Sequence, residues 1–113
     1  MTLTLTIIEQ PRGAVQSQAG HVVRRGGTIV GRSTACDWIL ADPKRSLSRR
    51  HCLIERRPEG FCLLDLSANG VFVNDAAQPL GPEGVHRLAD GDELRLGEYR
   101  LAVRCVTALL PGP

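Results

Sequence analysis

The chain has 113 residues, of which 42% are hydrophobic and 23% are charged, and its formal net charge is +2. This length is that of a single domain, and this balance of residues is typical of a folded protein rather than a disordered one. So small a net charge excludes nucleic-acid or membrane binding driven by the field of the whole molecule, so any electrostatic function must come from local clusters of Lys and Arg.

The first residues alternate polar and apolar side chains from Thr2 to Ile7, a pattern typical of a strand with one buried face. Further short apolar runs follow, separated by turn signals such as Arg57-Pro58-Glu59-Gly60 and Asp90-Gly91-Asp92. These runs predict strands at 21–24, 28–31, 38–40, 52–56, 61–66, 71–73, 85–88, 93–96 and 99–106. No segment predicts a helix. The rhythm of short strands and turns therefore predicts an all-β sandwich.

We expect one domain over residues 1–107, followed at 108–113 by a tail or the start of a linker. The run Leu109-Leu110-Pro111-Gly112-Pro113 has the breakers of a domain boundary, so we expect the chain to be part of a longer protein. No apolar run approaches the roughly 20 residues that span a bilayer, and the start lacks the apolar core of a signal peptide. These features predict a cytoplasmic location and no membrane contact by this domain.

The cysteines do not form a metal-binding pattern. They are scattered along the chain, with no C-x-x-C pair and no His at ligand spacing: Cys36, Cys52, Cys62 and Cys105. The last three lie in predicted strands, where a free Cys behaves as a small buried apolar residue, although the sequence leaves a disulfide open. Trp38, flanked by apolar residues, is predicted to lie in the core. We expect no metal and no cofactor.

The first candidate site residues are Gly31-Arg32, at the end of a predicted strand. An Arg there offers a planar fork of donors suited to phosphate or carboxylate, and the Gly allows a turn or a close approach of backbone. By itself the pair is a weak signal, because an Arg after a Gly is usually only a solvated side chain.

The second candidate is a basic loop. Lys44 and Arg45 precede Ser46-Leu47-Ser48-Arg49-Arg50-His51, so that cationic and hydroxyl side chains are concentrated within one loop. Such a cluster suits a dianionic group, with the Ser48 hydroxyl as an additional donor. Composition alone favours an ordinary solvated basic loop, and the Ser48 hydroxyl shifts this balance only modestly toward an anion site.

The third candidate is Ser67-Ala68-Asn69-Gly70, followed by Val71-Phe72-Val73-Asn74. Asn-Gly between apolar runs is a strong hairpin signal, because both residues tolerate positive φ, and this alone could explain their presence. An Asn at a loop tip also offers both an amide and a carbonyl with which to hold the backbone of an extended peptide.

In their order and spacing, these motifs resemble the forkhead-associated (FHA) domain family, and the resemblance covers roughly Thr28 to Val106. The family pattern is a Gly-Arg, then Ser-x-x-His, then x-Asn-Gly followed shortly by another Asn. Here the second and third of these are Ser48-Arg49-Arg50-His51 and Ala68-Asn69-Gly70, followed by Asn74. The resemblance implies a non-catalytic β-sandwich of about eleven mostly antiparallel strands, whose loops bind a phosphothreonine peptide.

The resemblance also implies roles for individual residues. Arg32 and Ser48 would contact the phosphate, and Arg49 would contact the phosphate or the peptide backbone. Asn69 would bond to the peptide main chain beside the phosphothreonine. The remaining positions would support the loops: Gly31, His51, Gly70 and Asn74.

Three further positions are possible accessory contacts of the peptide. Arg50 is a basic residue at the rim of the site. Ser46 lies where relatives select the side chain three residues after the phosphothreonine. Ala68 departs from the family, since many relatives have Thr or Ser there and gain a phosphate contact that Ala cannot supply.

A narrower resemblance concerns the opening Leu-Thr-Leu-Thr-Ile-Ile and the loop Ala41-Asp42-Pro43-Lys44-Arg45. Both are similar to the N-terminal FHA domain of bacterial type VI secretion proteins. This implies a threonine-phosphorylated partner linked to a Ser/Thr kinase and to secretion.

Alternatives to phosphothreonine recognition remain. Ala68 favours a phosphate-independent interaction module on the same fold, whereas Arg32, Ser48, Arg49 and Asn69 together argue for phosphate. An enzyme using His51 and Cys52 is disfavoured, because neighbours in a strand point to opposite faces. Nucleic-acid binding is disfavoured too, because the chain has one Trp, one Tyr and two Phe and lacks the interleaved aromatics of a stacking surface.

Overall fold

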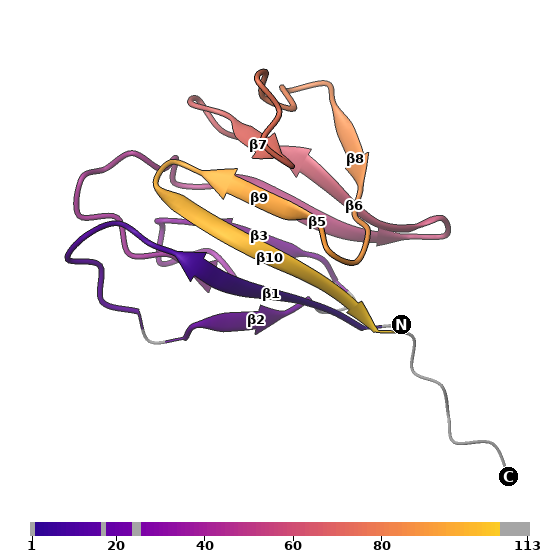
Figure 1. Ribbon diagram of the computed structural model, residues 1–113, viewed down its shortest axis with the longest axis horizontal. Helices are drawn as coiled ribbons and strands as arrows, with labels where there is room; N and C mark the ends of the chain where they lie inside the picture. The colour runs from indigo at the N-terminus through magenta and orange to yellow at the C-terminus, as the bar shows by residue number, and fades with distance from the viewer. Residues whose placement is uncertain (1, 17, 24–25, 107–113) are drawn as a thin grey trace, which may run out of the picture.

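The computed structural model describes residues 2–16, 18–23 and 26–106, which form two five-stranded sheets packed face to face (Figure 1). The first sheet has the order β2-β1-β10-β9-β7 and the second has the order β4-β3-β5-β6-β8. The strands in chain order are β1 (Thr2–Glu9), β2 (Gly20–Val22), β3 (Thr28–Gly31), β4 (Trp38–Ile39), β5 (Cys52–Arg57), β6 (Gly60–Asp65), β7 (Val71–Val73), β8 (Val85–Arg87), β9 (Glu93–Leu96) and β10 (Tyr99–Val106).

The first sheet is built around the pairing of the first and last strands. Thr2 lies opposite Val106 and Ile7 opposite Leu101, so both ends of the described chain meet at one end of the sandwich. The register shifts between Ile7 and Glu9, where the strand leaves the regular ladder. The long loops lie at the other end of the sandwich, on the left in Figure 1.

The second sheet contains a regular hairpin, in which β5 and β6 pair from Cys52↔Asp65 to Arg57↔Gly60. β3 runs antiparallel to β5 but parallel to β4, since Val30 pairs with Trp38. The sheets are thus mostly antiparallel, as the sequence predicts, with one parallel pair.

The core lies between the sheets, where alternate residues of each strand point inward. Leu3 and Leu5 of β1, Val30 of β3 and Ile54 of β5 are fully buried there. Trp38 is 2% exposed and belongs to the same cluster, which confirms its predicted place. This alternation is the pattern that predicted the strands.

The all-β sandwich is confirmed, and its ten strands correspond to the ten predicted from the sequence. The resemblance implied about eleven strands, whereas the described residues contain ten. The strand predicted at 21–24 begins one residue earlier, at Gly20, and its expected end at Arg24 lies outside the described residues. So does the tail predicted at 108–113. No helix able to cross a membrane occurs in the part of the chain that the structure describes.

The hairpin predicted at Asn69-Gly70 is wrong. β6 belongs to the second sheet and β7 to the first, so the loop between them crosses from one sheet to the other. Of the pair, only Gly70 has a positive φ, of 101°. Two apolar runs joined by a turn need not pair with each other, because each can pair with strands of a different sheet, as β6 and β7 do here.

Candidate functional site

Three loops meet at one end of the sandwich and bring the candidate residues together. Arg32 follows β3, and its backbone N–H donates to the Ser48 carbonyl at 3.3 Å. The next N–H, of Ser33, donates to the Arg49 carbonyl at 3.1 Å. From the β6–β7 loop, the Ala68 N–H donates to the Ser48 hydroxyl at 2.9 Å. Residues 20 positions apart in the chain are thereby fixed against one another.

Gly31 is required by close packing of the backbone at this point. A Cβ at this position would lie 2.2 Å from the carbonyl oxygen of Arg49, which is far inside van der Waals contact. The same carbonyl accepts a hydrogen bond from the Cys36 thiol at 3.0 Å. The absence of a side chain at Gly31 thus lets the Arg49 backbone lie directly against β3.

Arg32 is held by one edge of its guanidinium. Its side chain is half-buried, and Nε donates to the Leu47 carbonyl at 2.9 Å. This contact fixes the plane of the group, while the two terminal amino groups make no hydrogen bond to any described residue. A fixed, planar pair of donors is the arrangement that recognises a phosphate at two oxygens.

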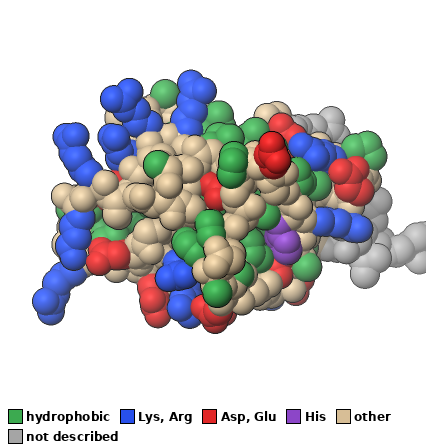
Figure 2. Space-filling view, turned by 90° about the horizontal axis from the view of Figure 1, so that it is seen from above, with side chains coloured by type: hydrophobic (Ala, Val, Ile, Leu, Met, Phe, Trp, Pro, Cys, Tyr) green, Lys and Arg blue, Asp and Glu red, His purple; other side chains and the backbone are tan. Residues whose placement is uncertain are grey.

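A shallow depression adjoins Arg32. Its lining residues are mostly basic or small: Arg32, Ser33, Ala35, Ser48, Arg49 and Arg50. None of its three arginines forms an ion pair with a carboxylate among the described residues. Figure 2 shows Lys and Arg side chains gathered at this end of the molecule. The depression is therefore cationic and suited to an anion.

His51 is the buried side chain that holds two of the loops around this depression together. It is fully buried; its Nδ1 accepts the Ser48 N–H at 3.1 Å and its Nε2 donates to the Gly70 carbonyl at 2.9 Å. A ring that accepts at one nitrogen and donates at the other is neutral. Burial lowers the pKa of His51, which agrees with this state. One side chain thereby links the β4–β5 loop to the β6–β7 loop.

The Ser48 hydroxyl joins two loops and can also donate a hydrogen bond to a ligand. Its hydroxyl oxygen accepts the Ala68 N–H, and the hydroxyl proton remains available to a ligand. The side chain is half-buried and lines the depression beside Arg49. A donor placed between cationic side chains is suited to a phosphate oxygen.

Asp65, at the end of β6, organises the Asn69 loop, and sequence reasoning missed it. Its carboxylate accepts the backbone N–H groups of Ser67, Val71 and Gly81 at 2.9, 3.0 and 3.1 Å, and the Ser67 hydroxyl at 2.5 Å. Burial by itself would raise the pKa of this carboxyl, but these hydrogen bonds outweigh it and hold the pKa below its usual range. No local motif marks an Asp whose carboxylate bonds to two loops and to the first residue of a strand.

Asp42 organises the basic loop in the same way and was also missed as a site residue. Its carboxylate accepts the backbone N–H groups of Ser46 and Leu47 at 2.9 and 2.8 Å. The Asn69 side chain then donates to the Ser46 carbonyl at 3.1 Å, which joins the two loops at their tips. The Asn69 carbonyl and its second amide proton remain for a ligand.

Tyr99 anchors the start of the same loop from the core. Its hydroxyl donates to the Ala41 carbonyl at 2.5 Å and accepts from Gln16 of the β1–β2 loop. Burial raises the pKa of Tyr99 to about 12, so the hydroxyl keeps its proton.

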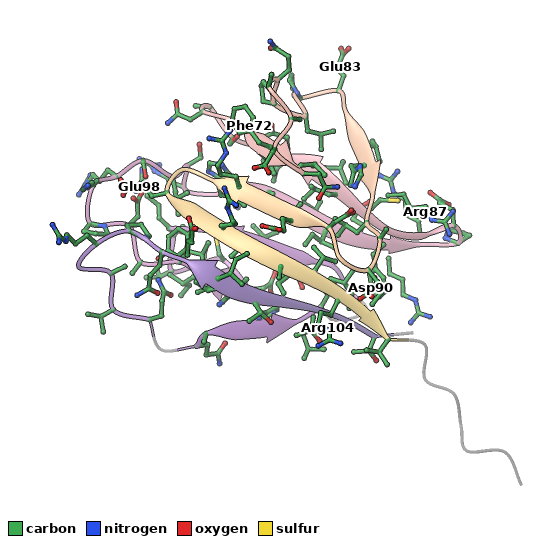
Figure 3. The ribbon with its side chains drawn as sticks, in the orientation of Figure 1. Phe72, Glu83, Arg87, Asp90, Glu98 and Arg104 are labelled. Atoms are coloured by element: carbon green, nitrogen blue, oxygen red, sulfur yellow. The ribbon has the colours of Figure 1, made fainter. Side chains whose placement is uncertain are left out.

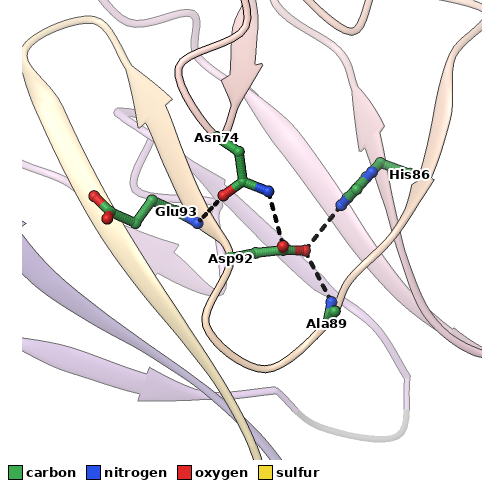
Figure 4. A network of polar contacts seen from close by, with 5 residues as sticks. All are labelled: Asn74, His86, Ala89, Asp92 and Glu93. Carbon is green, nitrogen blue, oxygen red and sulfur yellow. Dashed lines mark hydrogen bonds and ion pairs between the residues drawn. The ribbon is translucent and has the colours of Figure 1, made fainter.

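Asn74 does not join this site. Its side chain donates to Asp92 at 2.9 Å and accepts the Glu93 N–H at 2.9 Å, while the other oxygen of Asp92 contacts His86 and the Ala89 N–H (Figure 4). The backbone of Asn74 has a φ of 52°, which Asn tolerates better than most residues. This network ties the end of β7 to the start of β9.

The enzyme alternative invoked His51 and Cys52, and the structure buries both side chains fully. Burial raises the pKa of the Cys52 thiol well above its usual range, which opposes formation of a thiolate. All four cysteines are free, and the described residues contain no cluster of three or more potential metal ligands. A second, more apolar depression, lined by residues including Phe61, Leu88 and Cys105, contains none of the predicted site residues.

The predicted site residues therefore divide into two groups. The structure brings together around the depression Arg32, Ser48, Arg49, Arg50, Ala68, Asn69 and Ser46, supported by Gly31, His51 and Gly70. Asn74 lies in the separate network described above.

Comparisons with known proteins agree with this arrangement. The FHA domain family model matches residues 28–97. The FHA domain-containing protein FhaA of Mycobacterium tuberculosis is 39% identical over 85 residues, which are 74% of this chain and 15% of FhaA. This chain thus spans a small part of that relative.

Solved structures show the same fold. One, from a structural and functional analysis of phosphothreonine-dependent FHA domain interactions, is 32% identical, with a TM-score of 0.74 over 95% of this chain and 99% of its own. The FhaA FHA domain complexed with the intracellular domain of Rv3910 is 34% identical, with a TM-score of 0.69 over 90% and 99%. The chain belongs to the FHA domain family, whose members are non-catalytic phosphothreonine-recognition modules.

Proposed function

We propose that this chain binds a phosphorylated threonine in an extended segment of a partner protein, and that the depression at Arg32 receives the phosphate. The single observation that carries the proposal is the set of unpaired guanidinium groups around the Ser48 hydroxyl. Three arginines line one depression and none has a described carboxylate partner. Phosphothreonine carries about −1.5 to −2 charges at pH 7 and has three acceptor oxygens.

The energy available is sufficient for a useful affinity. Each charge-assisted hydrogen bond to phosphate contributes about 1.5–3 kcal/mol. Contacts from Arg32, Ser48 and Arg49 together would supply much of the roughly 8 kcal/mol that a micromolar complex requires. Because Asn69 is held by Ser46, its free polar atoms are preorganised to bond with the peptide backbone beside the phosphothreonine.

Ser46, Arg50 and Ala68 are assigned as accessory contacts at the edge of this site. Ala68 is exposed and supplies only its backbone N–H, to Ser48, so one phosphate contact of many relatives is absent. Losing such a bond costs about 1–2 kcal/mol, which weakens binding without abolishing it.

The experiment is calorimetric titration with a degenerate phosphothreonine peptide library, with the unphosphorylated and phosphoserine libraries as controls. Binding confined to phosphothreonine supports the proposal. Equal binding of all three libraries would instead favour a phosphate-independent interaction module on the same fold. Arg104, an exposed residue of β10, provides a matched control: Arg104→Ala removes one positive charge outside the depression and should leave the affinity unchanged.

We extend the proposal to the phosphorylated partner and to the cellular setting of this domain. We assign a partner phosphorylated by a Ser/Thr kinase, in the cytoplasm, and we place this domain in a bacterial type VI secretion protein on the similarity of the opening strand and the Ala41–Arg45 loop. Capture on the immobilised domain from cells of the source organism, followed by identification of phosphorylated proteins, tests this placement. Recovery of phosphoproteins unrelated to secretion would refute it.

A further inference from the structure

Ser33 lines the Arg32 depression but has no role in the proposed function. It follows Arg32 directly in the β3–β4 loop, and its side chain is half-buried. Its backbone N–H donates to the Arg49 carbonyl at 3.1 Å, and its carbonyl accepts the Cys36 N–H at 3.0 Å. Both backbone groups of Ser33 are therefore bonded, which fixes the residue against the β4–β5 loop.

The Ser33 hydroxyl uses only its oxygen in contacts with the described residues. Its Oγ accepts the Ala35 N–H at 3.1 Å, which closes a short turn. The hydroxyl proton is donated to no residue that the structure describes. The turn thus explains why an acceptor lies at this position, but it leaves a donor at the edge of the depression.

Ser33 and Ser48 present the same kind of donor to the depression from two different loops. Each hydroxyl oxygen accepts a backbone N–H, from Ala35 and from Ala68 respectively, and each hydroxyl has a proton left to donate. The two loops are joined directly, because the Arg32 N–H donates to the Ser48 carbonyl. A ligand in the depression therefore has one hydroxyl donor on each of two adjoining loops.

The electrostatic surroundings of Ser33 also suit an anion. Ser33 shares the depression with its three arginines, none of which forms an ion pair with a carboxylate in the described part of the chain. The acidic residue of the same loop, Asp37, accepts the Ile29 N–H at 2.8 Å instead. A hydroxyl dipole in a positive field turns its hydrogen away from the cations, and thus toward an anion that enters.

We infer that Ser33 is a phosphate-binding residue, an assignment that rests on the proposed function. Its hydroxyl donates to the phosphothreonine phosphate from the β3–β4 loop, while Ser48 donates from the β4–β5 loop. The assignment also bears on Ala68, which cannot supply the hydroxyl that many relatives have in the β6–β7 loop. Ser33 supplies a hydroxyl to the same depression from another loop.

The Ser33 hydroxyl is preorganised for this contact. The backbone is bonded at both its N–H and its carbonyl, and the oxygen is held by the Ala35 N–H, so binding restricts the side chain little further. A hydrogen bond to a charged group that is made at so small an entropic cost should raise affinity by about tenfold.

Ser33→Ala and Ser33→Thr test the contact by calorimetric titration with the degenerate phosphothreonine peptide library. Ser33→Ala should weaken binding by about tenfold, whereas Ser33→Thr keeps the hydroxyl and should stay within about twofold of the parent. Thr34→Ala is the matched control, because Thr34 is exposed on the same loop and is not among the residues that line the depression. Parent-like affinity of Ser33→Ala, or an equal loss in Thr34→Ala or Ser33→Thr, overturns the assignment.

A substitution that keeps the turn distinguishes phosphate binding from support of the loop. Ser33→Asp keeps an acceptor for the Ala35 N–H but replaces the donor by a negative charge, so affinity should fall by about 100-fold or more. Thr34→Asp adds the same charge one residue further along and should weaken binding only severalfold, because solvent and salt screen an exposed charge. Equal losses in the two Asp variants contradict a direct contact with the phosphate.

Arg104→Gln controls for the change in net charge. It lowers the net charge by one unit, as Ser33→Asp does, but Arg104 lies on β10 toward the end of the sandwich opposite to Glu98 and the loops around the depression (Figure 3). Its affinity should equal that of the parent. A loss as large as that of Ser33→Asp would show that net charge, rather than a contact, weakens binding, and would refute the role of Ser33.

The parent protein separates this assignment from the proposed function. Urea unfolding verifies that each variant is folded at the temperature of the titration. A parent that binds no phosphothreonine peptide refutes the proposed function and the role of Ser33 with it. A parent that binds, with Ser33 variants that match their Thr34 counterparts, refutes only the role of Ser33.

Discussion

The loops around the Arg32 depression and the Asn74 network use polar side chains in similar ways, but only the loops around Arg32 leave charged donors without a partner. At the loop end, His51 and Asp65 satisfy backbone groups of several loops, while Arg32 keeps unpaired donors at the surface. In the Asn74 network, the side-chain groups of Asn74 and Asp92 bond to one another and to adjoining backbone. The two regions thus differ in the positive charge that is left without a carboxylate partner, which is the feature expected of an anion site.

The largest expected effect is on phosphopeptide affinity, and it distinguishes the Arg32 depression from the Asn74 network. Arg32→Ala should reduce phosphopeptide affinity by about 100-fold, since two charge-assisted hydrogen bonds are lost. The free energy of unfolding should fall by only about 1 kcal/mol, from the lost bond to the Leu47 carbonyl. Titration calorimetry and urea unfolding measure the two quantities. Unaltered affinity in the variant would refute the role assigned to Arg32.

The converse variant is Asn74→Ala, in the structural network. It removes the hydrogen bonds to Asp92 and to the Glu93 N–H and places Ala at a positive φ, so the free energy of unfolding should fall by about 2 kcal/mol. Phosphopeptide affinity, measured well below the unfolding transition, should stay within about twofold of the parent. A large loss of affinity with unchanged stability would contradict the separation of the two regions.

The pH dependence of the free energy of unfolding tests whether His51, which links the loops around Arg32, is held neutral in the folded protein. Burial lowers the pKa of His51, so below about pH 6.5 the unfolded chain binds the proton more readily. The free energy of unfolding should therefore fall as pH drops from 6.5 toward the folded-state pKa, by up to about 1.4 kcal/mol per pH unit. Urea unfolding at a series of pH values measures this slope.

His51→Gln is the control for that slope. Gln does not titrate, so the difference in slope between parent and variant isolates His51 from the other histidines. Asp65 and Asp92 have lowered pKa values, so both proteins should lose further stability below about pH 4, as these carboxylates are protonated. Equal slopes for parent and variant between pH 7 and 5 would show that His51 is not held neutral.

The smallest effect is expected at Ala68. Ala68→Thr restores the hydroxyl that many relatives have there, and it should leave phosphopeptide affinity the same or raise it by up to about tenfold. Ala68 is exposed, so the larger side chain has room. A marked loss of affinity, measured by the same titration, would mean that this loop presents its side chain differently from its relatives.

Sequence reasoning located the strands because the alternation of buried and exposed residues is a local property. It also singled out Arg32, Ser48 and Asn69 by their resemblance to a family pattern of motifs in a fixed order, and the structure brings their loops to one end of the sandwich. It did not identify Asp42 or Asp65 as supports of the site, although each bonds to several backbone groups. Neither an Asp in a loop, such as Asp42, nor one at the end of a strand, such as Asp65, has a local feature that distinguishes a solvated carboxylate from one that bonds to several backbone groups.

The sequence by itself determined the all-β class, the strand positions and the basic character of one loop, because side-chain period and composition are encoded within a few neighbouring residues. Only the tertiary structure decided that the Asn69-Gly70 loop crosses between sheets, and that Asn74 supports a different corner of the molecule. It also brought Ser33 to the same depression as Ser48, from a different loop. These arrangements depend on which strands pair, and pairing is settled by the packing of distant segments into a common core.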